Sequence, residues 1–126
     1  MPPCRAGPPP RVLVVEDNHD ARESLGLVLA ARGWEVREAA DGAEGLRLAL
    51  GWRPDAVVSD IGLPGLDGWE VARRVRQALG RAVLLVALTG YGQDEDRRRS
   101  LDAGFDHHLS KPADPRDLLR LLGLAR

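Results

Sequence analysis

The sequence has almost none of several residue types, and each scarcity excludes a class of protein. The single cysteine, Cys4, allows no disulfide within the chain, so a reducing compartment is the simplest setting. The longest uninterrupted apolar run, AVLLVAL at 82–88, is far too short to cross a bilayer, and the opening MPPCRAGPPP lacks the apolar segment of a signal peptide. We therefore expect a cytoplasmic protein that makes no membrane contact.

An excess of either charge is also missing, since 18 basic and 19 acidic residues give a formal net charge of -1. Such a chain has no general attraction to nucleic acids or anionic membranes. The best local basic patch, in QDEDRRRS at 93–100, is offset by acids in the same run, which is typical of a solvated helix face. We expect no direct nucleic-acid partner. The motif G-x-x-x-x-G-K-[ST] is absent, which excludes a P-loop NTPase.

Lysine is the scarcest charged residue, because Lys111 is the only one and all other basic residues are arginine. Chance can leave a single lysine anywhere. An ammonium, however, is a compact point charge on a flexible stem, whereas a guanidinium is a planar fork, so a crowded anion site would favour lysine. The neighbours of Lys111 in the folded protein decide between these two explanations.

The length of 126 residues, with 44% hydrophobic and 29% charged residues, fits one folded domain. Five prolines in the first ten residues predict an extended tail or linker over residues 1–10, which could follow a preceding domain in a longer parent chain. The folded domain is expected to span residues 11–124.

Five short apolar runs alternate with segments of helical spacing. The runs are VLVV at 12–15, WEV at 34–36, AVVS at 56–59, AVLLVAL at 82–88 and, more weakly, HHL at 107–109. Strand-helix alternation with nearly continuous apolar strands predicts an α/β fold, a (βα)5 doubly wound sandwich whose parallel sheet is covered by helices on both faces. We expect the strand order 2-1-3-4-5.

Residues that begin or end helices agree with this alternation. Gly33 and Gly104 follow helical segments and fit left-handed C-caps. Asp41 with Glu44 has the spacing of a capping box, and Asp114 directly before a proline fits an N-cap followed by the first helical position. The last helix should therefore begin shortly after the lone lysine.

Polar side chains follow four of the five expected strands. Glu16 and Asp17 come after the first strand, Asp60 ends the third, Thr89 ends the fourth and Lys111 follows the fifth. Ligands of open α/β sheets bind beyond the carboxyl ends of the strands, where the winding reverses, and the expected order puts this reversal between strands 1 and 3. The carboxylates of the first and third strands should therefore face each other.

Three carboxylates at one crevice repel one another, and a hard divalent cation would neutralise them. Mg²⁺ prefers oxygen ligands, so Glu16, Asp17 and Asp60 match it better than they match zinc. The alternative is that Glu16 and Asp17 only favour the start of the following helix, which leaves the third acid without explanation. Mg²⁺ is the expected cofactor.

Asp60 ends an apolar strand and enters the glycine- and proline-rich turn DIGLPGLDG at 60–68, which includes Pro64 and Gly65 and is open enough for a ligand to approach. Its carboxylate can attack a phosphoryl group to form an acyl phosphate. The reaction needs mainly positioning and charge neutralisation. Lys111 and the hydroxyl group of Thr89 are candidates to contact the phosphoryl oxygens.

Four segments together resemble the signature of the receiver domains of two-component response regulators, the CheY-like superfamily. They are VLVVEDN at 12–18, SDIGLPGLDGWE at 59–70, ALTGYG at 87–92 and AGFDHHLSKP at 103–112. The resemblance covers essentially residues 11–124 and implies a flavodoxin-like fold. It also implies a phosphorelay function, in which a histidine kinase or a histidine phosphotransfer protein donates the phosphoryl group. The parent chain could be a hybrid sensor histidine kinase.

The same resemblance implies a role for each site residue. Asp60 would be the phosphoacceptor. Asp17 would bind Mg²⁺ directly and Glu16 through water, with the backbone carbonyl of Gly62 as a further ligand. Thr89 would be the switch hydroxyl and Lys111 the phosphoryl-binding lysine, in a family where the following Lys-Pro bond, here to Pro112, is often cis. The fourth helix, fifth strand and fifth helix would form the surface that changes for partner binding.

One position departs from the family pattern, since His108 stands where tyrosine or phenylalanine is common. An imidazole is smaller than those rings and titratable. We expect the coupling of Thr89 to the output surface to be weaker, pH-sensitive or routed through Tyr91, which follows Gly90. The adjacent His107 and His108 do not predict a shared metal, because neighbouring strand residues point to opposite faces.

The leading hypothesis is therefore a phosphorylation-controlled binding module that is not an enzyme, with an effector that the sequence does not identify. A degenerate receiver that serves as a scaffold is one alternative, supported only by His108. A phosphohydrolase with an aspartyl nucleophile is another. Such a hydrolase usually needs a second acid near its nucleophile, and Gly62 has no side chain to supply one.

Overall fold

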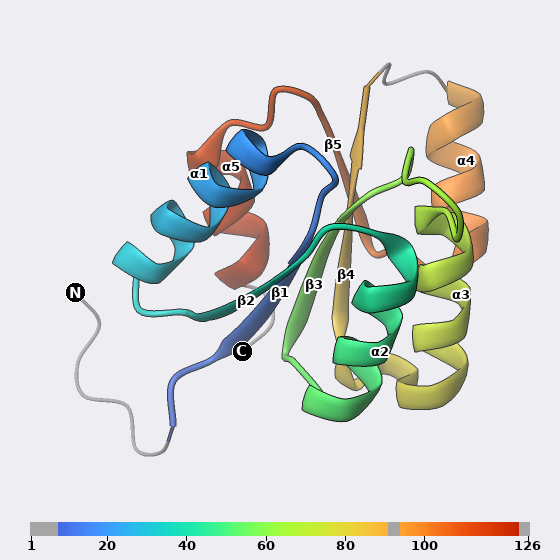
Figure 1. The fold of residues 1–126 in the computed structure, drawn as a ribbon. Helices are drawn as coiled ribbons and strands as arrows, with labels where there is room; N and C mark the ends of the chain where they lie inside the picture. Colours follow the sequence, from blue (N-terminus) through green and yellow to red (C-terminus); the bar gives the residue numbers. More distant parts are fainter. Residues whose placement is uncertain (1–7, 91–93, 124–126) are drawn as a thin grey trace.

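Strands and helices alternate along the chain in the computed structural model, which describes residues 8–90 and 94–123 (Figure 1). In chain order the elements are β1 (Arg11–Val15), α1 (His19–Ala31), β2 (Glu35–Ala39), α2 (Gly42–Trp52), β3 (Ala56–Asp60), α3 (Gly68–Leu79), the 3-10 turn η1 (Gly80–Ala82), β4 (Leu84–Thr89), α4 (Asp94–Ala103), β5 (His107–Ser110) and α5 (Pro115–Leu122).

All strands pair in parallel in one sheet of order β2-β1-β3-β4-β5, as predicted. β1 pairs with β2 on one side and with β3 on the other, so the winding reverses between β1 and β3. Every residue of β3 is buried, whereas β2 at the edge of the sheet buries fully only Ala39. The carboxyl ends of β1 and β3 therefore lie side by side at the reversal point.

Alternate residues of the strands supply two apolar clusters, one on each face of the sheet. Leu13 and Val15 of β1 pack with residues of α2 and α3, whereas Val12 and Val14 pack with residues of α1 and α5. Figure 1 shows α1 and α5 on one face and α2, α3 and α4 on the other. This is the period-two alternation of strands buried on both faces. Because apolar side chains cover both faces of the sheet, polar side chains that could bind a ligand lie at the ends of the strands.

The predicted helix ends are confirmed with one difference at α2. Asp41 Oδ1 accepts the Glu44 N–H at 2.8 Å, as in a capping box, but Glu44 Oε1 accepts the N–H of Ala40 at 3.2 Å, one residue earlier than that motif requires. Gly33 and Gly104 have φ of 94° and 114°, in the left-handed region that glycine adopts without strain.

Arg76 of α3 links this helix to the starts of β4 and β5. Its guanidinium donates hydrogen bonds to the carbonyl oxygens of Gly80, Val83 and Gly104, and to the carboxylate of Asp106 at 2.8 Å. The two charged side chains are only 18% and 25% exposed. The network fixes the amino-terminal ends of β4 and β5, the ends opposite the candidate site. Within the described part of the chain, no helix combines the length and apolarity that crossing a membrane would require.

Candidate functional site

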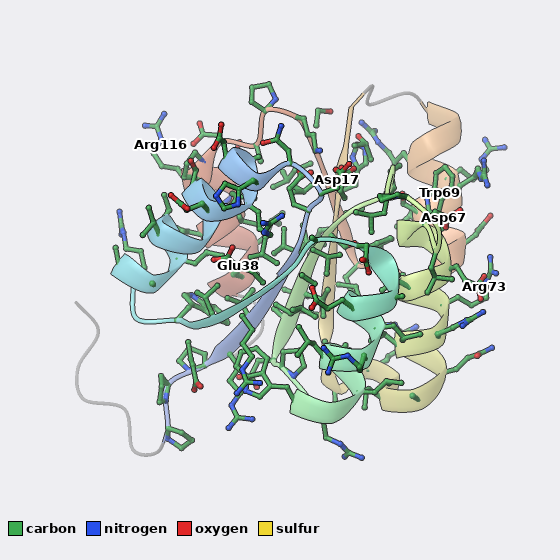
Figure 2. The ribbon with its side chains drawn as sticks, in the orientation of Figure 1. Asp17, Glu38, Asp67, Trp69, Arg73 and Arg116 are labelled. Carbon is green, nitrogen blue, oxygen red and sulfur yellow. The ribbon has the colours of Figure 1, made fainter. Side chains whose placement is uncertain are left out.

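Glu16 and Asp17 lie where the chain leaves β1 and turns into α1. Asn18 is the N-cap of α1, and its side chain accepts the N–H of Ala21 at 2.9 Å. Glu16 is buried, with its Oε2 accepting the Asn18 N–H at 3.1 Å, so the cap residue also holds this carboxylate inward. Asp17 is exposed and lies at the edge where the strands end (Figure 2).

Asp60, the last residue of β3, is 7% exposed and begins a turn that folds back on itself. Its Oδ1 accepts the N–H of Gly62 at 3.0 Å, and the N–H of Gly68 donates to the carbonyl oxygen of Ile61 at 3.1 Å. Gly68 starts α3 so close to this turn that a Cβ atom would collide with the backbone of Asp60 and Ile61. The turn therefore presents the Asp60 carboxylate at the edge of the sheet with α3 packed directly behind it.

The three acids converge as the sequence predicted. Ligand oxygens of Glu16, Asp17 and Asp60 all lie within 4.8 Å of one another. Lys111, from the segment after β5, places its Nζ 2.7 Å from Glu16 Oε1 and 2.7 Å from Asp60 Oδ2. The only lysine thus bridges two carboxylates in a crowded site, which favours the ammonium explanation over chance.

Burial and charge act on the ionisation of this cluster. Burial raises the pKa of Glu16 above its ordinary value, and the neighbouring Asp17 and Asp60 add to the rise, while the hydrogen bond from Lys111 opposes it. For Lys111, burial lowers the pKa, but the hydrogen bonds to Asp60 and Glu16 outweigh this effect and leave the pKa raised. The ammonium is therefore charged at neutral pH.

The donor set fits a hard divalent cation. It consists of carboxylate oxygens, and one ammonium cannot neutralise three carboxylates, so negative charge remains in excess. The buried Glu16 and Asp60 supply fixed donors, and the exposed Asp17 supplies one from the solvent side. The Gly62 N–H bonds to Asp60, while a ligand role for the Gly62 carbonyl remains a prediction.

Thr89 ends β4 with its side chain buried, and its Oγ1 lies 2.9 Å from Nε2 of His108 in β5. Its carbonyl oxygen accepts the N–H of Lys111 at 2.7 Å. The sequence predicted that His108 alters the coupling of Thr89, but it could not show this direct hydrogen bond. Tyr91, the other residue proposed for that coupling, lies outside the described residues.

The remaining loop residues surround the edge of the sheet. Pro64 and Gly65 are exposed in the turn after β3, where Gly65 has φ of 71°, and Gly90 is exposed after β4. The peptide bond between Lys111 and Pro112 is cis.

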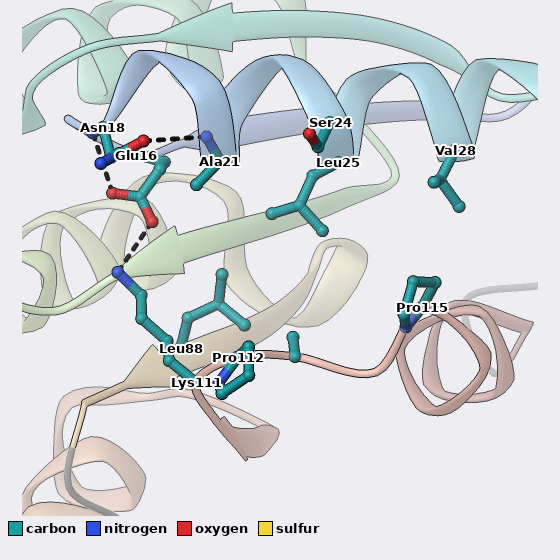
Figure 3. A pocket seen from close by; sticks show the side chains of 11 residues that line it. Glu16, Asn18, Ala21, Ser24, Leu25, Val28, Leu88, Lys111, Pro112 and Pro115 are labelled. Atoms are coloured by element: carbon teal, nitrogen blue, oxygen red, sulfur yellow. Dashed lines mark hydrogen bonds and ion pairs between the residues drawn. The ribbon is translucent and has the colours of Figure 1, made fainter.

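A pocket of about 520 Å³ lies beside the acidic cluster, between α1 and the segment that leads into α5 (Figure 3). Its walls are mainly apolar and include Leu25 of α1, Leu88 of β4 and Pro115 of α5. Glu16 and Lys111 line its polar end, where Figure 3 marks their contact. The pocket thus adjoins the charged site, while Asp17, Asp60 and Thr89 are not part of its lining.

Three supporting contacts were missed by sequence reasoning. Arg22 donates to the carbonyl oxygen of Glu16 at 2.8 Å and pairs with Glu38 at 3.3 Å, a contact between separate elements that leaves no local sequence signal. The bond from the Gly62 N–H to Asp60 was detectable, because an aspartate followed two residues later by an available N–H is the pattern of an Asx-turn.

Comparison with known proteins shows which family the chain belongs to. The family model for the response regulator receiver domain matches residues 12–123 of this chain. The chain belongs to this family. Receiver domains act in two-component signalling, where they interact with histidine kinases or phosphotransfer proteins and with effectors. Among curated relatives, response regulator MprA of Mycobacterium sp. (strain KMS) is 43% identical over 119 residues, which are 94% of this chain and 51% of MprA. This receiver domain therefore spans about half the length of that relative.

Solved receiver structures share the fold. Chemotaxis protein CheY4 of Vibrio cholerae has 31% identity and a TM-score of 0.86, with 93% of this chain and 98% of that chain covered. The receiver domain of sensor histidine kinase PA1611 from Pseudomonas aeruginosa has 35% identity and a TM-score of 0.84, with 92% and 96% covered. That receiver was crystallised with a magnesium ion coordinated in its active-site cleft.

Proposed function

We propose that this receiver domain accepts a phosphoryl group on Asp60 from the phosphohistidine of a histidine kinase or a histidine phosphotransfer protein. The observation that carries this proposal is the position of Lys111, whose ammonium bridges Asp60 and Glu16 within a cluster of three carboxylates. The ammonium lies beside the Asp60 carboxylate, so it can stabilise the negative charge of phosphoryl oxygens at the position where that carboxylate would attack.

In the proposed reaction an oxygen of the Asp60 carboxylate attacks phosphorus. The bond between phosphorus and the donor's imidazole nitrogen breaks as the new oxygen–phosphorus bond forms, and an acyl phosphate results. The Gly62 N–H holds Oδ1 at 3.0 Å and so orients the carboxylate. Lys111, already 2.7 Å from Oδ2, supplies positive charge to the transferred group, and the hydroxyl of Thr89 donates a hydrogen bond to it.

Glu16, Asp17 and Asp60 would hold Mg²⁺, together with the carbonyl of Gly62. When bound, the ion supplies positive charge that neutralises the carboxylates and the phosphoryl oxygens. The magnesium ion of the PA1611 receiver, a structure with 35% identity to this chain, supports this assignment.

The product of the reaction is a changed surface rather than a released metabolite. Phosphorylation adds negative charge at the carboxyl edge of the sheet, and this charge biases the conformation of α4, β5 and α5 for partner binding. The hydrogen bond between Thr89 and His108 supports this direction of coupling, because it links the end of β4 to β5. We propose a cytoplasmic signalling domain that is not itself an enzyme.

Intact mass spectrometry tests the proposal. After incubation with Mg²⁺ and acetyl phosphate, the wild type should gain one phosphoryl group and Asp60→Asn should gain none. Asp102→Asn, a matched change at an exposed aspartate of α4, should behave like the wild type. No gain in the wild type would favour the scaffold alternative. Continuous release of phosphate without an accumulated adduct would favour the phosphohydrolase.

A further inference from the structure

The register of the sheet places Thr89 and His108 together. His108 pairs with Ala87 across β4 and β5, and Thr89 follows Ala87 by two residues, so the two side chains are diagonal neighbours on the same face. Oγ1 and Nε2 are 2.9 Å apart, which is a hydrogen bond of normal length. Thr89 is 0% exposed, so the orientation of its hydroxyl is set by the protein around it and not by bulk water.

We propose that His108 is a positioning residue for phosphorylation. With Asp60 phosphorylated, His108 donates its Nε2–H to Thr89 Oγ1, which directs the single hydroxyl proton of Thr89 to the phosphoryl group. This inference rests on the proposed function of Asp60.

The direction of the hydrogen bond decides whether Thr89 can serve the phosphoryl group. A hydroxyl has one proton to donate and two lone pairs that accept, whereas a neutral imidazole has one donor and one acceptor nitrogen. If Nε2 accepts, it takes the only Thr89 proton and the phosphoryl oxygens receive none from this residue. If Nε2–H donates, the imidazole does not take the Thr89 proton, which can then bond to a phosphoryl oxygen. Hydrogen bonds to charged oxygens are the stronger ones, so phosphorylation favours the second arrangement.

A phenyl ring at position 108 could not supply this donor, which is why the histidine matters. A glutamine could, because its side-chain amide N–H reaches about as far as Nε2 and also donates. His107 is the matched control. It pairs with Val86, a residue of the cluster on the α1 and α5 face, so strand alternation turns it away from Thr89.

The first experiment is a double-mutant cycle on the ratio of phosphorylated to unphosphorylated protein at steady state with acetyl phosphate. We expect His108→Phe to lower this ratio by about 2- to 10-fold, the range that one hydrogen bond gives, and His108→Gln to retain most of it. Thr89→Val should lower the ratio as well. In the Thr89→Val background, His108→Phe should have no further effect, because its action passes through the hydroxyl. His107→Gln should match the wild type.

The second experiment reads the hydrogen bond directly by ¹⁵N NMR of the imidazole during steady-state phosphorylation. Nε2 of His108 should carry a proton in the phosphorylated protein. An unprotonated Nε2, or additive effects of His108→Phe and Thr89→Val, would overturn the inference about His108. If the wild type were still phosphorylated in that case, the proposed function would stand. A wild type that gains no phosphoryl group would overturn both.

Discussion

The site requires an ammonium rather than a guanidinium at position 111, and this requirement can be tested by substitution. We expect Lys111→Arg to lower the steady-state fraction phosphorylated by acetyl phosphate by about 10-fold or more, since a hydrogen bond to a charged group contributes about 1.5–3 kcal/mol. The planar guanidinium needs a wider approach than the space where Nζ lies 2.7 Å from two carboxylates. Arg116→Lys, at an exposed position of α5, is the control. If Lys111→Arg were phosphorylated like the wild type, the site would not require an ammonium, and chance would explain the position of the single lysine.

Glu16 gives a prediction for pH, because burial raises its pKa above the ordinary 4.5. The Glu16 carboxyl group therefore binds its proton more tightly in the folded state than in the unfolded state. The stability that protonated Glu16 contributes is complete below pH 4.5 and is lost as pH rises through the raised pKa. Glu16→Gln keeps the neutral form at every pH, so its free energy of unfolding relative to the wild type should increase with pH over this window.

Urea denaturation in magnesium-free buffer measures this difference, since bound Mg²⁺ would favour the charged carboxylate. Glu35→Gln, an exposed change on β2, should follow the wild type across the same pH range. Parallel curves for Glu16→Gln and the wild type would contradict the raised pKa.

Sequence reasoning identified the polar residues of the site because each of them follows a strand, and parallel strands end at one edge. It could not assign their partners. That Lys111 bridges Glu16 and Asp60, and that His108 reaches Thr89, depends on side-chain directions set by the register of β4 and β5. Such contacts join residues far apart in the sequence, so no local pattern records them.

At the scale of elements, the charged network of Arg76 holds α3 against the amino-terminal ends of β4 and β5. Arg76→Met would leave the Asp106 carboxylate partly buried without its cation, and we expect a loss of about 3 kcal/mol in the free energy of unfolding. Arg73→Met removes an exposed pair with Glu70 on the same helix, and it should cost less than about 1 kcal/mol. Equal losses for the two variants in urea denaturation would show that the buried network contributes no more than a surface pair.

The boundaries of two strands show where element prediction fails. β2 runs over Glu35–Ala39 rather than 34–36, because at the sheet edge it carries exposed charged residues that interrupt its apolar pattern. β4 begins at Leu84, two residues after the predicted start, because Gly80–Ala82 form a 3-10 turn that continues the preceding helix. The apolar interior strands β1 and β3 were predicted closely, since burial on both faces gives them a continuous signal.

In the whole molecule, the two apolar clusters stabilise the sheet from both faces, and an excess of negative charge lies at the carboxyl edge of the sheet. A chain with a formal net charge of -1 places three carboxylates against one ammonium at its carboxyl edge. Electrostatic repulsion at this edge opposes folding, so a ligand that neutralises the edge should stabilise the entire domain.

Mg²⁺ should therefore raise the melting temperature of the wild type. At about 100 times its dissociation constant the ion would add about 2.7 kcal/mol to stability, which corresponds to roughly 10 °C for a domain of this size. Asp17→Asn should lose most of this increase, because it removes a proposed ligand that is exposed and not part of the core. Potassium chloride at matched ionic strength controls for screening, which acts on all surface charges alike. Equal increases with both salts, or an undiminished magnesium effect in Asp17→Asn, would place the ion elsewhere on the molecule.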